Sequence, residues 1–194
     1  MSARKAAYPI NPVFLERWSP RAFDGSNMPK EHLLTILEAA RWAPSAFNLQ
    51  PWRFLYAVRG DENWMRFKDM LIPWNQEWAE SASVLLYILS DSMTETKWGG
   101  EQISHSHSFD AGAAWACLAL QASLMSYHAH AMTGVDFDRA RTDLGIPSRF
   151  RIEAAAVVGR IGDPAILSEK LRAREVPSSR KSVTEFAFSG NFPC

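Results

Sequence analysis

The chain has 194 residues, of which 47% are hydrophobic, so it can build one domain with a substantial core and is far from the disordered class. Its 21 basic residues balance its 21 acidic ones, and this zero net charge argues against a nucleic-acid-binding protein, which would carry a basic surface. The two cysteines form no disulfide framework, and no apolar stretch resembles a signal peptide or reaches the roughly 20 residues of a membrane span, so we expect a cytoplasmic protein.

The first predicted elements are an arm, a helix and a strand. The N-terminal arm covers 1–16. Apolar residues then recur at helical spacing in 29–43, where Pro29 suits the first turn and Pro44 should end the helix. The stretch WRFLYAV (52–58) predicts a strand, because β-branched and aromatic residues dominate it.

The middle of the chain continues with a helix, a strand and a loop. Residues from about 61 to 71 are rich in Trp, Phe and Met and predict a helix that breaks near Pro73. The almost unbroken apolar run 83–89 predicts a strand covered on both faces. Residues 91–108 are polar and predict a long loop, and such loops are uncommon unless they are mobile or functional.

The second half carries the central helix and the last strands. We expect the alanine-rich helix at 110–128, a strand in 129–135, a short helix in 136–145 and a strand at 151–162. The C-terminal arm, 163–194, holds phenylalanines in a polar context, and a partner subunit could supply the surface that buries them. Together the elements predict one α+β domain over the whole chain, with a small sheet wrapped by helices.

Two basic segments could bind phosphate. Arg17, Ser19 and Arg21 would share one side of an extended segment, where two guanidiniums and a hydroxyl suit the oxygens of a dianion. The tail repeats this chemistry in SSRK, which ends with Arg180 and Lys181. The alternative for both segments is a solvated stretch with ordinary surface charges.

Two further segments could approach a flat ligand closely. The loop APSAFNLQPW (43–52) has small residues before Asn48, and the amides of Asn48 and Gln50 both donate and accept hydrogen bonds. Its alternative interpretation is a capped connector from helix to strand with Trp52 in the core. In MTGVD (132–136) a glycine could bring backbone near a ligand, or could simply form a turn.

Other site classes find little support. The pairs His105/His107 and His128/His130 have no clear third ligand, and no CxxC or HExxH occurs, so we predict no metal site. His105 and His107 lie in the polar loop, where contact with substrate is more plausible than contact with zinc. P-loop, dinucleotide-binding and nucleophile-elbow motifs are absent from the sequence.

In register, these segments resemble the nitroreductase family of FMN flavoproteins over nearly the whole chain. The most specific stretch is the Ser-x-x-Asn-x-Gln-Pro-Trp that follows the first long helix. The other matching segments are RWSPRAFDG (17–25), LLTILEAARWAPSAFNLQPWRF (33–54), SVLLYIL (83–89), DAGAAWACLALQA (110–122), GVDFDRARTDLGIP (134–147) and the closing basic pair with its aromatic tail. The resemblance implies a nitroreductase-like α+β fold, with a small mixed sheet flanked by helices, in an intertwined homodimer whose C-terminal arm packs on the partner.

The resemblance also implies the contacts of one FMN per subunit, bound at the dimer interface. The phosphate contacts would be Arg17, Ser19, Arg21, Arg180 and Lys181. The loop residues that line the isoalloxazine ring would be Pro44, Ser45, Ala46, Phe47 and Asn48. The remaining contacts would be Asn75, Thr133 and Gly134, the last two near the reactive N5 side. Trp78 stands where some members carry a lysine and Thr133 where some carry an acidic residue, so the side chains available to tune the flavin differ here.

The activity implied by the resemblance is the reduction of a small acceptor, such as a nitroaromatic or a quinone, by NADH or NADPH through FMN in a ping-pong mechanism. The cofactor carries this chemistry, so no catalytic side chain is assigned. Specialised alternatives within the family are a dehalogenase or an ene-reductase. Outside it, a flavin storage or sensor module without turnover and a structural dimer without ligand stay open.

Overall fold

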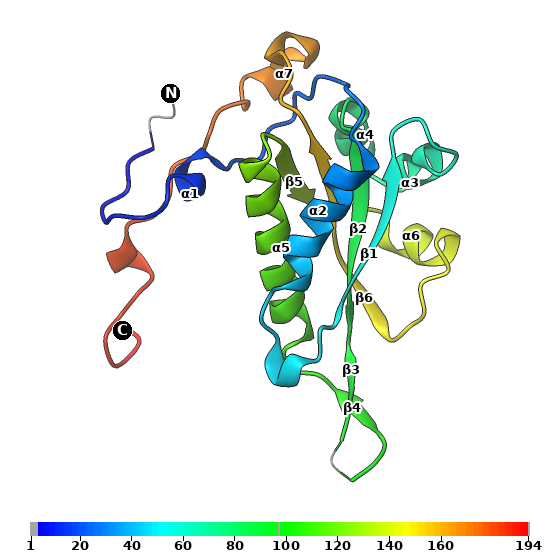
Figure 1. Cartoon of the computed structure of the whole chain (residues 1–194), viewed down its shortest axis with the longest axis vertical. Coiled ribbons are helices and arrows are strands. Elements are labelled where there is room, and N and C mark those ends of the chain that lie inside the picture. Colours follow the sequence, from blue (N-terminus) through cyan, green and yellow to red (C-terminus); the bar gives the residue numbers. More distant parts are fainter. Residues whose placement is uncertain (1–3, 97, 194) are drawn as a thin grey trace.

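A four-stranded sheet forms the centre of the computed structural model, which describes residues 4–96 and 98–193 (Figure 1). The strands, in their order across the sheet, are β1 (Trp52–Val58), β2 (Val84–Asp91), β6 (Phe150–Gly159) and β5 (His128–Met132). The predicted small sheet is confirmed, but each of its pairings is antiparallel. The expectation of a mixed sheet is therefore wrong for the described part of this chain.

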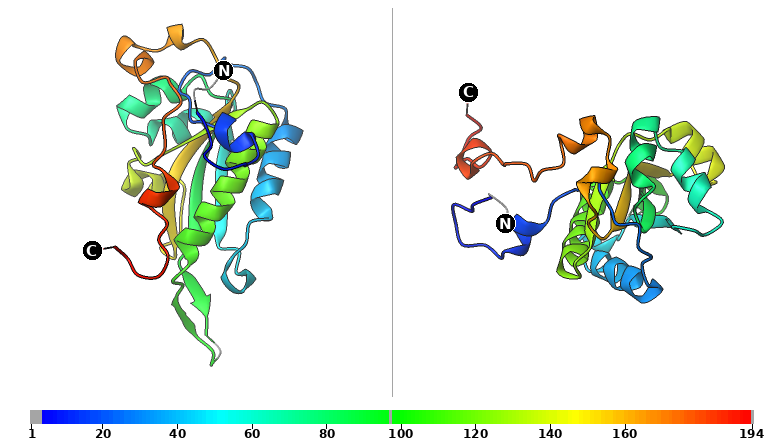
Figure 2. Two further views of the ribbon diagram at one scale, coloured as in Figure 1. Left: turned by 90° about the vertical axis from the view of Figure 1, so that its left-hand side faces the viewer. Right: turned by 90° about the horizontal axis from the view of Figure 1, so that it is seen from above.

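Helices cover both faces of this sheet and build two separate core clusters (Figures 1 and 2). The long helices α2 (Lys30–Arg41) and α5 (His107–Leu124) pack on one face. The short helices α3 (Trp64–Asp69), α4 (Pro73–Ala79) and α6 (Phe137–Asp143) lie on the other. The helices predicted in 29–43, 61–71, 110–128 and 136–145 are thus confirmed to within a few residues at their ends, whereas α4 was not predicted.

Strand β2 needs an unbroken apolar run because both of its faces are buried inside the molecule. Alternate side chains point to opposite faces of a strand. Leu85 and Tyr87 accordingly join the core under the short helices, whereas Leu86 and Ile88 join the core under α2 and α5. Both faces are covered, as the run 83–89 predicted.

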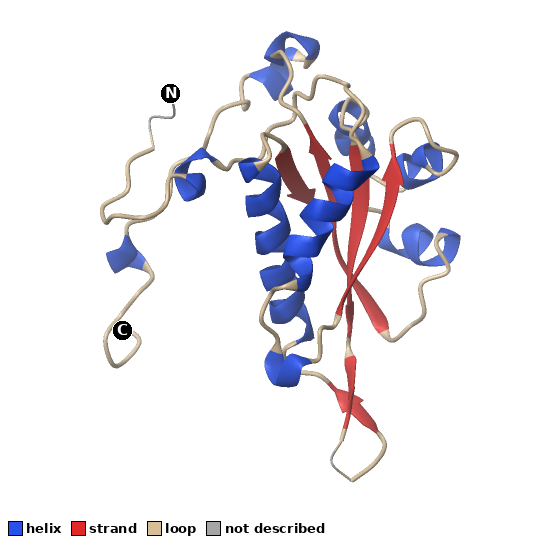
Figure 3. Ribbon diagram, in the orientation of Figure 1, coloured by secondary structure: helices blue, strands red, loops and turns tan. Residues whose placement is uncertain are grey.

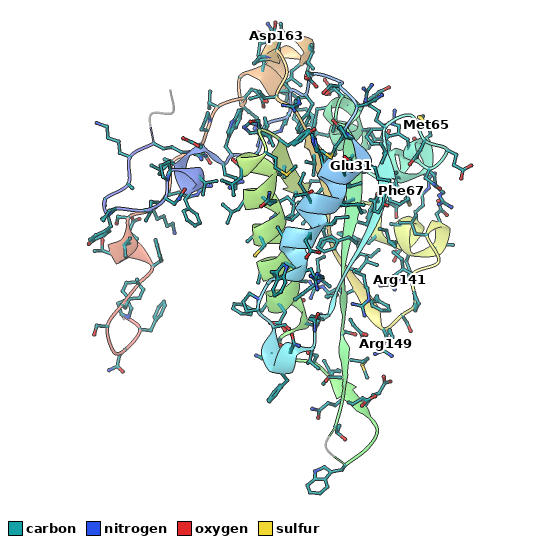
Figure 4. All side chains as sticks on the ribbon, in the orientation of Figure 1. Glu31, Met65, Phe67, Arg141, Arg149 and Asp163 are labelled. Carbon is teal, nitrogen blue, oxygen red and sulfur yellow. The ribbon has the colours of Figure 1, made fainter. Side chains whose placement is uncertain are left out.

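Two local predictions were incomplete. The predicted break near Pro73 is confirmed, since α3 ends at Asp69, but Pro73 also starts α4, because proline fits the first helical turn, whose N–H groups need no intrahelical partner. Residues 91–108 contain a hairpin, β3 (Met93–Glu95) and β4 (Glu101–Ile103), and not merely a loop. Arg149 fastens its base through ion pairs with Asp91 at 2.9 Å and Glu101 at 3.0 Å (Figure 4).

The two arms run together away from the body (Figures 2 and 3). The first carries α1 (Val13–Glu16), and the second carries η3 (Val183–Glu185). The preceding η2 (Pro164–Ile166) and α7 (Glu169–Arg172) lie on the body, where Leu167 and Leu171 are buried in the core (Figure 1). Arg4 Nε donates to the Ser178 carbonyl at 2.9 Å and so joins them. The side chains of Phe186, Phe188 and Phe192 stay exposed in the chain alone. Residues 1–3 and 194, at the ends of the predicted arms, lie outside the described residues.

In the described part of the chain, no helix combines the length and the apolar composition that crossing a membrane requires.

Candidate functional site

A basic cavity of about 260 Å³ opens where the segment after α1 meets the C-terminal arm. Four residues of the predicted phosphate set line it, namely Arg17, Ser19, Arg21 and Arg180. The other lining residues are Arg4, Trp18, His130, Arg174, Val176 and Ser178. The cavity therefore gathers five guanidiniums, and none of its described lining residues is acidic. Lys181 is exposed and does not line the cavity.

The donors of this cavity are arranged for an anion. Burial, then the nearby charges of Arg180 and Arg4, lower the pKa of Arg17. Burial, then Arg174, likewise lowers the pKa of Arg21, which Glu175 partly offsets. Arg21 Nε is buried without a hydrogen-bond partner among the described residues. Because an unsatisfied buried donor is costly, concentrated positive charge and this free N–H together fit a phosphate group.

A buried carboxylate supports the cavity from behind. Glu175 Oε1 accepts the backbone N–H groups of Arg21 at 2.7 Å and Ala22 at 2.8 Å. Its second oxygen lies 3.9 Å from Arg21 Nη1, and its side chain is 2% exposed. Glu175 thus fixes the backbone of the phosphate-binding segment and offsets part of its charge.

His130 forms a neutral wall of the cavity. Its Nδ1 lies 2.8 Å from the Pro20 carbonyl oxygen, and its ring stacks on Trp78 with centroids 4.6 Å apart. Burial, with a smaller contribution from Arg21 and Arg17, lowers the pKa of His130 to about 4, although the bond to Pro20 acts in the opposite direction. The imidazole is therefore uncharged at neutral pH.

A ring stack and two hydrogen bonds connect His130 to the predicted residues near the flavin ring. Trp78 Nε1 donates to Asn75 Oδ1 at 3.3 Å, and Asn75 Nδ2 donates to the Gly134 carbonyl at 3.1 Å. A side chain at Gly134 would collide with Asn75 Nδ2 and with the side chain of Ile72. The glycine thus allows close packing here, and Thr133 beside it is exposed. Trp78 is 2% exposed and acts as a core residue.

The predicted ring-lining loop has an unusual backbone around η1 (Ala46–Asn48). Phe47, Asn48 and Gln50 have positive φ angles of 50°, 56° and 49°, which residues other than glycine rarely adopt. Ser45 Oγ accepts the Gln50 N–H at 3.0 Å, and the buried Asp110 accepts the Ala46 N–H at 3.1 Å. Strained backbone that is held in this way clusters at functional sites. Phe47 is 94% exposed, and Pro44 and Asn48 are exposed beside it.

A single chain does not bring this loop to the basic cavity. The loop lies at the N-terminal end of α5, whereas the cavity lies near the other end of that helix (Figure 1). A helix of 18 residues is about 27 Å long. The predicted site residues therefore form two groups: 44–48 at one end, and the cavity with Asn75 and Gly134 at the other.

The histidines of the polar stretch do not build a centre of their own. His105 is exposed, whereas His107 Nδ1 lies 2.7 Å from Ser90 Oγ and 3.7 Å from Glu153. A second cavity of about 330 Å³ lies under the hairpin, but three of its charged lining residues pair with one another, since Arg149 binds both Asp91 and Glu101. Among the residues with described positions, no three potential ligands gather around a common metal position.

Sequence reasoning missed several residues of the basic cavity. Arg174 lies in the predicted C-terminal arm without a motif of its own, and the HxH spacing of His130 suggested only a metal ligand. The alternation of His128 and His130 on a strand could have indicated a shared face. Nothing local identified Glu175 as buried, because its partners are 153 and 154 residues away.

Comparison with known proteins identifies the family of this chain. The model of the Nitroreductase family matches residues 15–71. A solved structure of an oxidoreductase containing FMN is 52% identical, covers 100% of this chain and 98% of its own, and superposes with a TM-score of 0.96.

More distant relatives add two points. A putative nitroreductase in complex with FMN from Desulfovibrio desulfuricans is 24% identical, with a TM-score of 0.71 over 95% of this chain and 100% of its own, and so shares the fold. The CLA biosynthesis enone reductase of Lactiplantibacillus plantarum is 24% identical over 84% of this chain and 90% of its own length.

Proposed function

This chain belongs to the nitroreductase family, and on that premise we propose that it is an FMN-dependent oxidoreductase that reduces small organic acceptors with NADH or NADPH. The observation that carries the proposal is the basic cavity, where five guanidiniums and the unpartnered Arg21 Nε fit one phosphate group. A relative that contains FMN, at 52% identity over the full chain, supports the choice of this phosphate ligand.

Different residues would bind the phosphate and the ring of the cofactor. Arg17, Ser19, Arg21 and Arg180 would bind the phosphate, as charge-assisted bonds from planar guanidiniums suit its oxygens. Gly134 and Asn75 would lie toward the ring, and Lys181 would add charge at the mouth of the cavity. When bound, FMN supplies the electron transfer between the nicotinamide and the acceptor. The protein positions the ring and leaves one face open, which supports ping-pong kinetics.

A homodimer would complete this site. Helix α5 is apolar nearly all round, yet Phe109, Gly112 and Ala116 lie exposed on one stripe of it. A helix that is apolar on every side is normally buried. A second copy packed on this stripe, with the arms wrapped around it, could bring its own 44–48 loop to the ring end of the cavity. Each FMN would then contact both chains.

The dimer is tested by placing a charge on this stripe. We expect Ala116→Arg to sediment as a monomer and to lose FMN, because burying an unpaired guanidinium in an apolar interface is costly. The matched control is Met65→Arg, an exposed position on α3 across the sheet, which should stay dimeric (Figure 4). A wild-type protein that sediments as a monomer with full FMN content would contradict the shared site.

The test of the activity is the visible spectrum of the purified protein. We expect flavin bands that bleach when NADH or NADPH is added without oxygen, and that return with a nitroarene or a quinone. Because one relative is an enone reductase, an activated alkene belongs among the acceptors. Bands that survive both nicotinamides would favour a storage or sensor module. A colourless protein that binds no added FMN would overturn the proposal.

We place this activity in the cytoplasm, since the two cysteines provide no disulfide framework and Cys117 is a free thiol.

A further inference from the structure

We propose that His130 is a further cofactor-binding residue, whose Nε2 accepts a hydrogen bond from a hydroxyl of the sugar-alcohol chain that joins the phosphate to the ring. The inference rests on the proposed function. It assigns a polar contact to the middle of the site, between the residues proposed for the phosphate and those proposed for the ring.

His130 lies on β5 between the arginines of the basic cavity and the residues proposed to lie near the ring. Its side chain lines the basic cavity, while Thr133 and Gly134 follow three and four residues later on the same segment. At about 3.3 Å per residue of extended chain, these positions lie roughly 10–13 Å from His130. The contacts from His130 through Trp78 and Asn75 to Gly134 connect the two places. A ligand with its phosphate among the arginines and its ring near Gly134 would lead its linking chain past His130.

The hydrogen bond to Pro20 decides which nitrogen is available. A backbone carbonyl can only accept, so Nδ1 carries the proton in the 2.8 Å contact with Pro20. In a neutral imidazole the other nitrogen, Nε2, then holds a lone pair. The stacked Trp78 ring fixes the plane of the imidazole. Among the described groups, none donates to Nε2, so a ligand can use it.

The charges around His130 select a hydroxyl over a phosphate oxygen. Arg17 and Arg21 line the same cavity as His130, and burial, followed by their charges, lowers the pKa of the ring so that it stays uncharged. A lone pair repels an ionised phosphate oxygen, and the arginines already supply donors for that group. A hydroxyl hydrogen is the complementary partner for Nε2. The inferred ligand class is therefore a phosphate ester with hydroxyls on the adjacent chain.

Two variants separate the roles of the two ring nitrogens. His130→Asn keeps a donor for Pro20 but removes the acceptor, whereas His130→Gln can place its amide oxygen near the Nε2 position and loses the Pro20 bond. The ligands are FMN, riboflavin and a flavin with its phosphate on a plain alkyl chain. Binding is read from quenching of flavin fluorescence between pH 6.5 and 9. His128→Asn, on the same strand but outside the cavity lining, is the control.

We expect His130→Asn to weaken FMN and riboflavin binding by a similar factor of about three to ten, the size of one neutral hydrogen bond. Binding of the alkyl phosphate flavin should not change, and His130→Gln should bind FMN nearly as the wild-type protein does. Neither effect should depend on pH.

Three results would overturn the inference. A loss confined to the two phosphate-bearing flavins, and varying with pH, would show that His130 contacts the phosphate. A tenfold loss of FMN binding in His130→Gln with no loss in His130→Asn would show that His130 acts only through its hydrogen bond to Pro20. If His130→Asn does not fold, a tenfold loss of FMN binding in His130→Gln is by itself sufficient to overturn the inference. A wild-type protein that binds none of the three flavins instead overturns the proposed function, and this inference with it.

Discussion

Replacing Arg17 and Arg180 together by glutamine is expected to weaken FMN binding at least about a hundredfold. Both side chains line the basic cavity from segments that lie far apart in the sequence. A hydrogen bond to a charged group contributes about 1.5–3 kcal/mol, so losing two amounts to at least about 3 kcal/mol. Glutamine keeps most of each side chain's stem, so the change is mainly one of charge and of donors. Fluorescence titration with FMN measures the effect.

The controls for this experiment separate charge at the cavity from charge elsewhere. Riboflavin lacks the phosphate and should bind the variant and the wild-type protein equally. Arg41→Gln with Arg66→Gln removes two exposed arginines whose described partners are on their own helices or caps, and FMN binding should persist. Equal FMN affinity in the Arg17/Arg180 variant would mean that these guanidiniums are incidental surface charges and that the basic cavity does not hold the phosphate.

Replacing Glu175 by alanine is expected to destabilise the protein by about 3–5 kcal/mol, because it breaks a buried ionic contact. The change leaves the backbone N–H groups of Arg21 and Ala22 without their acceptor and removes the carboxylate near Arg21 Nη1. It also releases the contact between two segments more than 150 residues apart. For a domain of this size we expect the midpoint of thermal unfolding to fall by roughly 6–20 °C.

Two companion variants identify the cause. Glu175→Gln retains Oε1 as an acceptor and loses only the charge, so it should cost less than Glu175→Ala. Glu62→Ala removes an exposed carboxylate without a described partner and should change the free energy of unfolding by less than about 0.5 kcal/mol. Urea unfolding curves of the three variants provide the comparison. A Glu175→Ala protein as stable as the Glu62→Ala control would show that the buried contacts contribute nothing.

Much of the fold could be predicted because its signals are local. The apolar spacing of 29–43 predicted α2, and the extended pattern of 52–58 predicted the residues of β1. The hairpin at 91–108 was missed because its strands have only 3 residues each, too few for an alternating pattern to appear. The Gly99-Gly100 pair, both with positive φ, was the available turn signal.

The candidate site divides in the same way. Alternation in an extended segment predicted that Arg17, Ser19 and Arg21 would share a side, and the structure places all three on one cavity. The sequence could not show that Trp78 is buried against His130, because that contact joins residues 52 positions apart.

The sequence by itself determined most of the elements, the core strand and the residue types that suit a phosphate, since these depend on neighbours along the chain. Only the tertiary structure decided that Arg4, Arg174, Arg180 and His130 meet the same cavity. It also decided that the 44–48 loop lies at the other end of α5. Packing sets such distances between remote segments, and no periodicity in the sequence encodes them.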